Sequence, residues 1–308
     1  MSAGYDDFQE FRDWYRMQRR RRSGRTASEH TLRTKSVYLA RTARETGAES
    51  PEVLANLLTQ PVVAGRLLRH FEEAITPGAA RVAVYALLNF AEYAVDQGWL
   101  SSVNDSCITR EDVPPRNPKA PISVYSEVEM EAFVRAARGV DLRWWALITF
   151  LVDTGRRIGE TLSIEWDWVR LDADPAYVEL PDTKNGEPQY VPLTRRLRDE
   201  VFTPANIEWM KSHEKAGHMA FRRDVSRHPF PWNYSTVKGR FERFCERTGL
   251  PDRGFHCFRH TVITERLARG VPLQAVSKLA GHSSVAVTAA RYDHTDALTF
   301  SRYIEREE

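Results

Sequence analysis

The chain has few cysteines, almost no net charge and no long hydrophobic run. Its three cysteines, Cys107, Cys245 and Cys257, are odd in number and scattered, which excludes a disulfide framework and favours a reducing cytoplasm. The longest apolar run, Trp144 to Val152, is too short to cross a bilayer. The first ten residues contain no apolar segment of the kind found in secretory signals. We therefore expect a cytoplasmic protein with no membrane partner.

The net charge of +2 does not by itself indicate a nucleic-acid partner, but the positive charges are unevenly distributed. The segment from Lys211 to Arg247 is basic, and a compact block near the N-terminus contains Arg19, Arg20, Arg21, Arg22 and Arg25. Such blocks are most often solvated faces or tails. They contact phosphates only where the fold turns them toward one surface.

The length of 308 residues predicts two domains, each large enough for its own core. Residues 1–112 show helical periodicity and no alternating strand pattern before Leu100. Residues 113–121, with the sequence VPPRNPKAP, contain four prolines and predict an extended linker. Residues 122–308 then form the second domain, including a C-terminal tail.

Several helix starts can be predicted in the first domain. Thr26 precedes Glu29 by the three positions of a capping box. Ser50-Pro51 is a typical helix-start pair, and Pro77 opens a further helix that ends near Gly98.

The second domain has a mixed pattern. Trp144–Val152 predicts a buried helix that ends at Thr154-Gly155. Two short segments, 176–180 and 189–193, read as strands, and Asn185-Gly186 between them is a strong hairpin signal. From Thr194 onward the pattern is again helical, except that the stretch from Gly217 to Ser235 shows no clear periodicity and reads as a loop.

Four polar clusters lie at the ends of these predicted elements. Arg157 and Glu160 are three positions apart and share a helix face, where the carboxylate can orient the guanidinium or simply form a surface ion pair. Lys184 lies at the hairpin tip, a position at which lysine most often serves solubility. Gly281-His282 precedes a short helix, and Tyr292 follows that helix.

The remaining cluster lies in GFHCFRHTVITERLARG, Gly254 to Gly270, which reads as an amphipathic helix. His256, Arg259 and His260 crowd its first turns. A solvated first turn would explain them. So would an anion site, because backbone N–H groups and the helix dipole favour negative charge at a helix N-terminus.

The order of these clusters is more specific than any one of them. In the segments TGRRIGETLSIEW, TKNGEPQYVPL, HCFRHT and GHSSVAVTAARYDH, the sequence resembles the tyrosine recombinases, also called the phage integrase family. The resemblance extends from about Ser123 to His294. Two positions depart from the family pattern: Cys257 stands where aspartate is usual, and His282 and Tyr292 are one position further apart than expected.

The resemblance implies a mainly α-helical fold with a small β-sheet in the catalytic domain. It implies two domains of the simple type, an N-terminal helical core-binding (SAM-like) domain and an α+β tyrosine-recombinase catalytic domain. The implied activity is site-specific recombination through a 3′-phosphotyrosyl intermediate and a Holliday junction, with no metal, ATP or other cofactor. The implied partner is double-stranded DNA with inverted-repeat core sites. On that DNA the chain would form a homotetramer or pair with a related recombinase. The implied setting is the cytoplasm, in association with the nucleoid, for a protein of a prokaryote, a phage or a mobile element.

The resemblance also implies roles for single residues. The catalytic residues would be Arg157, Lys184, His256, Arg259, His282 and Tyr292. Arg157 and Arg259 can grip phosphate oxygens bidentately, and Lys184 would protonate the leaving 5′ oxygen. Tyr292 would be the nucleophile, His256 its general acid/base and His282 a further hydrogen-bond donor. Glu160 and His260 would support these groups, and the N-terminal arginine block would bind DNA.

Three other interpretations fit parts of this pattern. A type IB topoisomerase uses similar residues, and a non-catalytic DNA-binding relative could keep the fold. A zinc site could use Cys245, His256, Cys257 and His260, but no paired ligand spacing supports one. We therefore predict no metal site.

Overall fold

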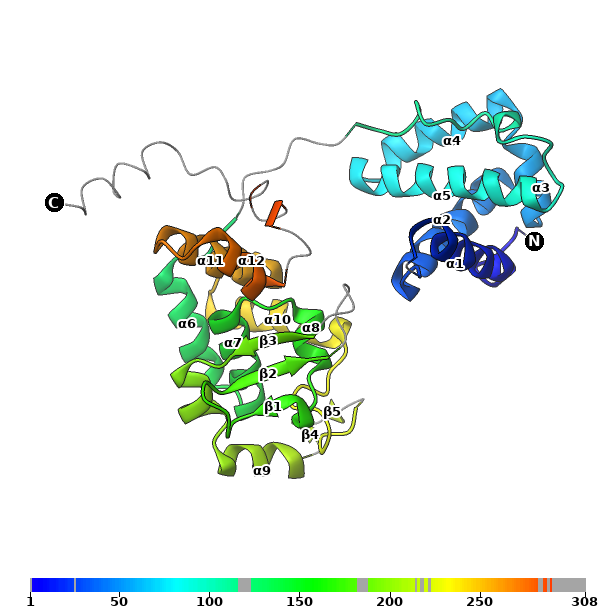
Figure 1. Ribbon diagram of the computed structural model, residues 1–308. Coiled ribbons are helices and arrows are strands. Elements are labelled where there is room, and N and C mark those ends of the chain that lie inside the picture. The colour runs from blue at the N-terminus through cyan, green and yellow to red at the C-terminus, as the bar shows by residue number, and fades with distance from the viewer. Residues whose placement is uncertain are drawn as a thin grey trace. The chain divides into compact units, whose positions relative to one another are not determined.

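The computed structural model describes residues 2–24, 26–115, 123–181, 188–213, 215–216, 219–220, 223–281, 285–286 and 289. The chain divides into two compact units, Met1–Ala120 (unit 1) and Pro121–Glu308 (unit 2), shown in Figure 1. This division falls inside the segment predicted as a linker. Each unit has its own hydrophobic core. No helix in the described ranges has the length and apolar character needed to cross a bilayer.

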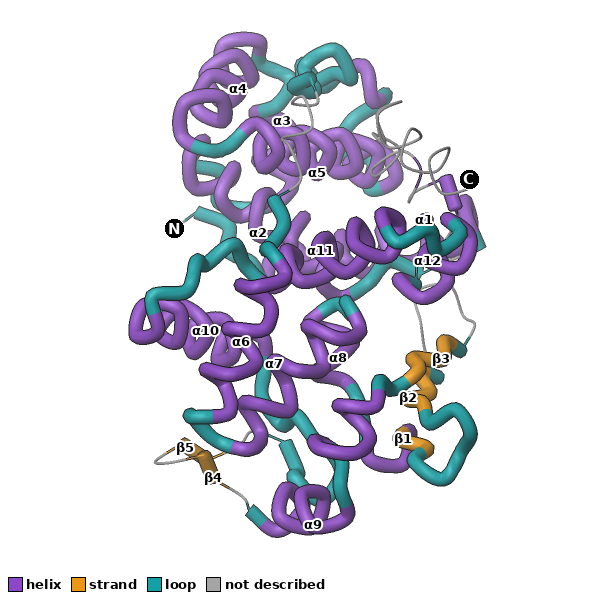
Figure 2. The backbone as a smooth tube through the Cα atoms, turned by 90° about the vertical axis from the view of Figure 1, so that its left-hand side faces the viewer, coloured by secondary structure: helices purple, strands orange, loops and turns teal. Residues whose placement is uncertain are grey.

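The described residues of unit 1 form helices and no strand (Figure 2). The elements are η1 (Asp6–Phe8), α1 (Gln9–Ser23), α2 (Glu29–Thr46), α3 (Pro51–Leu57), α4 (Pro61–Ala74), α5 (Pro77–Asp96) and η2 (Val103–Asp105). Aromatic side chains join α1 to α5, because the Phe11 ring lies 6.0 Å from Phe90 and 5.7 Å from Tyr93 between centroids. All three rings belong to the hydrophobic core of unit 1.

The helix starts predicted at Pro51 and Pro77 are confirmed, and the side chains of Ser50 and Thr76 cap them. The cap predicted at Thr26 is wrong. Helix α2 begins at Glu29, and the Ser28 hydroxyl accepts a hydrogen bond from the backbone N–H of Thr31. Ser28 takes this role because it is the last residue with extended backbone before the helix. Helix α4 was not predicted.

The described residues of unit 2 are also mainly helical, and their strands form two small sheets (Figure 2). Its helices are α6 (Glu127–Arg138), α7 (Leu142–Thr154), α8 (Ile158–Ser163), η3 (Trp166–Trp168), the π-helix η4 (Leu197–Val201), α9 (Pro204–Ser212), α10 (Tyr234–Thr248), α11 (Phe255–Ala268) and α12 (Leu273–Ala280). Its strands are β1 (Val169–Arg170), β2 (Tyr177–Leu180), β3 (Gln189–Pro192), β4 (Lys215–Ala216) and β5 (Met219–Ala220). A mainly α-helical fold with a small sheet is therefore confirmed.

Helix α7 is the centre of unit 2. Every residue from Arg143 to Val152 is buried, as expected of a helix covered on all faces. It packs against α6, α8, α9 and α11. The predicted end at Thr154-Gly155 is confirmed, and Gly155 closes the helix with a φ of +63°.

The predicted hairpin strands are confirmed. β2 and β3 pair antiparallel, with Tyr177 opposite Pro192 and Leu180 opposite Gln189. The two-residue strand β1 pairs with the other edge of β2 and was not predicted. Residues 182–187, which lie between β2 and β3 and include Lys184, are outside the described residues.

Gly155 provides a test of this architecture. Its positive φ is unfavourable for alanine, and an added Cβ would lie 2.9 Å from Val262 Cβ in α11. Gly249, which ends α10, has a similar φ of +69°, but nothing lies within 4 Å of its Cβ position. We expect Gly249→Ala to lower the free energy of unfolding by about 1–2 kcal/mol, and Gly155→Ala to cost about 1–3 kcal/mol more. Chemical denaturation measures both. Equal losses of unfolding free energy in the two variants would show that Val262 in α11 does not pack closely against Gly155.

Candidate functional site

The end of α7 brings α11 close to the beginning of α8. The Gly155 carbonyl accepts a hydrogen bond of 3.4 Å from Nη1 of Arg259 in α11. Val262, in the next turn of α11, packs against the same glycine. Only a residue without a side chain permits both contacts. The short segment from Gly155 to Arg157 therefore connects the core helix to two arginine-bearing elements.

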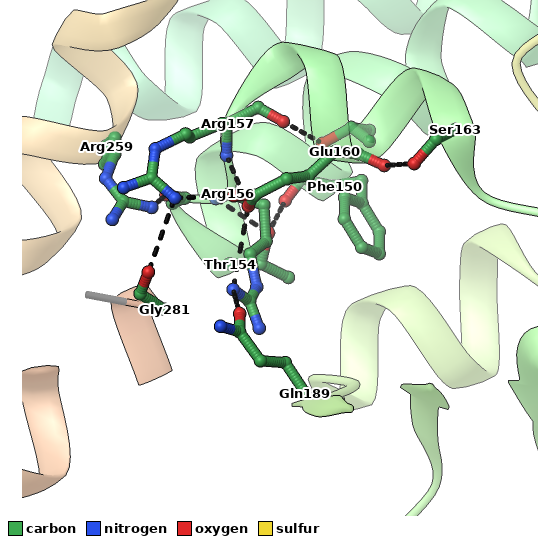
Figure 3. Close-up of polar contacts among 11 residues, drawn as sticks. Phe150, Thr154, Arg156, Arg157, Glu160, Ser163, Gln189, Arg259 and Gly281 are labelled. Atoms are coloured by element: carbon green, nitrogen blue, oxygen red, sulfur yellow. Dashed lines mark hydrogen bonds and ion pairs between the residues drawn. The ribbon is translucent and has the colours of Figure 1, made fainter. Parts of the chain in front are cut away.

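Arg157 is the residue immediately before α8, and its backbone is extended. Its guanidinium Nη1 lies 2.5 Å from Glu160 Oε1 and donates a second hydrogen bond of 3.4 Å to the Gly281 carbonyl (Figure 3). The Arg157 side chain is 40% exposed, so a ligand could reach it. The predicted pairing of Arg157 with Glu160 is confirmed.

Glu160 does more than pair with Arg157. Its Oε2 accepts the backbone N–H of Arg157 at 3.4 Å, which completes a capping contact at the start of α8. A carboxylate at this position is favoured by the helix dipole. Glu160 therefore fixes both the backbone and the side chain of Arg157.

Arg259 approaches the same place from α11. Only 4% of the residue is exposed, so its guanidinium has little freedom to move. His256 lies three positions earlier on this helix, on nearly the same face, and is exposed. His260 follows on the same helix and is half-buried. The predicted helix with His256, Arg259 and His260 in its first turns is confirmed as α11.

Arg156 was missed by the sequence analysis. It is 1% exposed, and its Nη1 donates to Gln189 Oε1 at 2.7 Å. Nη1 also lies 3.6 Å from Glu160 Oε2. Burial lowers the pKa of this guanidinium, and the Glu160 carboxylate partly offsets that effect. A lone arginine beside Arg157 gave no periodic signal that could have predicted its burial.

Three of the predicted site residues, Lys184, His282 and Tyr292, lie outside the described residues, and so does Arg25. The other arginines of the N-terminal block, Arg19 to Arg22, are exposed at the last turns of α1 in unit 1. Cations are favoured at a helix C-terminus. Arg22 also forms an ion pair of 3.1 Å with Glu92.

Cys257, one of the two departures from the family pattern, follows His256 in the sequence and is buried. Its Sγ donates to the Ser123 carbonyl at 3.2 Å. Burial raises the pKa of Cys257 and raises the pKa of Cys245 to about 12. Across the described part of the chain, no three His, Cys, Asp or Glu side chains form a group that could hold a metal ion. Cys257 is therefore a packing residue that fixes α11 to the segment before α6.

Thiol labelling tests this assignment. Because burial keeps Cys245 and Cys257 protonated and covered, we expect the folded protein to react only at the half-buried Cys107 at a pH of about 8. All three thiols should react after denaturation. Rapid labelling of Cys257 in the folded protein, located by peptide mass spectrometry, would contradict a packing role.

The model of the phage integrase family matches residues 124–298, which is more than half of the chain. The chain is 27% identical over 267 residues to a protein from Caldanaerobacter subterraneus subsp. tengcongensis named tyrosine recombinase XerC-like, covering 74% of this chain and 66% of the relative. It is also 27% identical over 165 residues to the shufflon-specific DNA recombinase of Escherichia coli, covering 53% of this chain and 38% of that protein. The chain thus spans about two thirds or less of the length of these relatives.

Two solved structures are similar in fold. The XerH site-specific recombinase bound to difH substrate aligns with a TM-score of 0.66 and 16% identity, over 98% of this chain and 85% of that one. A lambda integrase dimer bound to a COC′ core site aligns with a TM-score of 0.62 and 16% identity, over 96% of this chain and 97% of that one. Arg157 immediately before α8 and Arg259 in α11 fit this match, and the family model covers more than half of the chain: the chain belongs to the phage integrase family.

Proposed function

We propose that this chain is a site-specific DNA recombinase that cuts and rejoins DNA through a 3′-phosphotyrosyl intermediate and a Holliday junction, without metal or ATP. The observation that carries the proposal is the approach of Arg157 and Arg259 to the end of α7 from different elements. Family membership and the names of the relatives support the same activity. The proposed domains are a core-binding domain at 1–112, a linker at 113–121 and a catalytic domain at 122–308.

Two fixed guanidinium groups suit a phosphodiester. Each can donate two parallel hydrogen bonds to non-bridging oxygens, which a lysine cannot do. Arg157 is held by Glu160 and the Gly281 carbonyl, and Arg259 is held by burial. Preorganised donors of this kind stabilise charge that develops in a transition state, by about 3–4 kcal/mol each. They would bind the pentacoordinate phosphorane more tightly than the ground-state phosphate.

The remaining steps follow from the family resemblance. The Tyr292 hydroxyl attacks phosphorus, and His256 takes its proton. The bond from phosphorus to the 5′ oxygen breaks, and Lys184 protonates that oxygen. His282 donates a hydrogen bond to a phosphate oxygen. Glu160 and His260 support the catalytic side chains. The phosphotyrosyl bond keeps the energy of the broken bond, so a 5′ hydroxyl from a second duplex can reverse the reaction.

The proposed partners are double-stranded DNA with inverted-repeat core sites and three further copies of this chain, or a related recombinase. A solved lambda integrase structure with a similar fold is a tetramer bound to a Holliday junction. Arg19, Arg20, Arg21, Arg22 and Arg25 would contact the DNA backbone as exposed cations. The proposed setting is the cytoplasm, in association with the nucleoid.

The nucleophile gives the direct test of this function. The preferred binding site would first be selected from a pool of random duplexes. A duplex containing that site would then be synthesised with a nick, so that the cleaved strand cannot be rejoined and the covalent intermediate accumulates. We expect wild type to form a covalent adduct on a denaturing gel, and Tyr292→Phe to bind the same DNA without an adduct. Tyr303→Phe is the control and should cleave normally. An adduct in Tyr292→Phe, or one mapped to Tyr303, would contradict the assignment.

Supercoil relaxation measured beside strand exchange separates the proposal from its alternatives. Strand exchange between two duplexes is expected. Relaxation without exchange would indicate a topoisomerase, and binding without an adduct would indicate a non-catalytic relative.

The arginines give a second prediction. Arg157→Ala and Arg259→Ala should each slow single-turnover cleavage by roughly 100- to 1,000-fold, as the loss of one preorganised donor does. Arg198→Ala is a matched control, because Arg198 is exposed in unit 2 and pairs with its neighbour Asp199. It changes the net charge equally and should cleave at nearly the wild-type rate. Near-normal cleavage by Arg157→Ala or Arg259→Ala would disprove the phosphate clamp.

A further inference from the structure

Arg156 is an unusual use of arginine, because it lies beside a ligand-accessible arginine and yet is almost fully buried. Arg157 is 40% exposed at its side chain, whereas Arg156 is 1% exposed. Figure 3 shows the two side chains directed to different partners, Arg157 toward Gly281 and Arg156 toward Gln189. Arg156 therefore cannot touch a DNA phosphate from this position.

Arg156 contacts side chains from two separate parts of unit 2, β3 and α8. Its Nη1 donates to the Gln189 side chain at the first residue of β3. The same nitrogen lies 3.6 Å from Glu160 Oε2, and the other oxygen of Glu160 pairs with Arg157. The two arginines thus share one carboxylate.

Gly281, which ends α12, packs directly on this contact. A Cβ at Gly281 would lie 2.6 Å from Arg156 Nη1 and would also clash with Gln189 Oε1. The Gly281 carbonyl is in turn an acceptor for Arg157. The beginning of α8, the beginning of β3 and the end of α12 therefore meet around Arg156.

Stability alone does not explain this arginine. Its Nε and Nη2 are buried and have no hydrogen-bond partner among the described residues. A buried ion with incomplete pairing is commonly replaced by an apolar side chain of similar volume without loss of stability. Its partners would tolerate the change, because Gln189 is half-buried and Glu160 keeps its ion pair with Arg157.

We propose that Arg156 is a positioning residue that holds the beginning of β3 and the end of α12 against Glu160, and through Glu160 sets the place of the Arg157 guanidinium. The inference rests on the proposed recombinase function. Arg156 acts on the reaction only through these neighbours.

Arg156→Met tests this role against a purely structural one. We expect an unchanged or higher melting temperature, unchanged affinity for the selected duplex, and single-turnover cleavage slower by on the order of 100-fold, as expected when a reacting group is misplaced by about 1 Å. Gln189→Leu should slow cleavage as well. The double variant should be no slower than the worse single variant, because both remove one contact.

Arg143→Met is the matched control, since Arg143 is also 1% exposed but lies in α7 and donates to the carbonyls of Met210, His213 and Pro229. The Arg143→Met substitution leaves these buried carbonyls without this donor, and it should therefore lower the melting temperature. Cleavage by its folded fraction should stay near the wild-type rate. If Arg156→Met instead lost stability and cleaved normally when folded, the positioning role would be wrong.

Amide hydrogen exchange measured without DNA tests the same contact independently of catalysis. Arg156→Met should lose amide protection at the beginning of β3 and the end of α12, while α7 stays protected. Unchanged protection at both places would overturn the inference. If wild type formed no DNA adduct but the variant still lost this protection, the proposed function would fail and the positioning contact would stand.

Discussion

The shared carboxylate of Glu160 is the interaction on which the site depends. It lies at the start of α8, where the helix dipole favours a negative charge, and it faces two guanidinium groups from consecutive residues. One of these groups is buried and the other is open to a ligand. Without Glu160, Arg156 would be an almost uncompensated buried cation, and Arg157 would be free to sample many rotamers. A single negative charge therefore allows the site to carry a fixed positive charge that a phosphate can reach.

Two glycines make this arrangement sterically possible. Gly155 ends α7 in a left-handed conformation and lets α11 approach, so that Arg259 reaches the same region as Arg157. Gly281 ends α12 in the same conformation and lies against Arg156 and Gln189. In both places backbone takes the space that a side chain would need. Because α7 is buried along nearly its whole length, these contacts are built on the core helix of unit 2.

Much of this site could be predicted from local sequence signals. The Asn-Gly pair between alternating segments predicted the β2–β3 pairing, and Thr154-Gly155 predicted the end of α7. The spacing of Arg157 and Glu160 predicted their ion pair. The burial of Arg156 could not be predicted, because it depends on Gln189, 33 positions away, and on the path of α12. The cap of α2 was misassigned because Thr26 and Ser28 both have capping side chains, and only the backbone decides between them.

The central claim is that the arginines act by neutralising the oxygens of a scissile phosphate. A methylphosphonate at the cleavage position tests it directly, because a methyl group replaces one charged oxygen and the substrate no longer needs that neutralisation. The account predicts that Arg259→Ala cleaves the methylphosphonate duplex much faster than the natural phosphate, while wild type gains nothing from the change. Equally slow cleavage of both duplexes by Arg259→Ala would contradict the account.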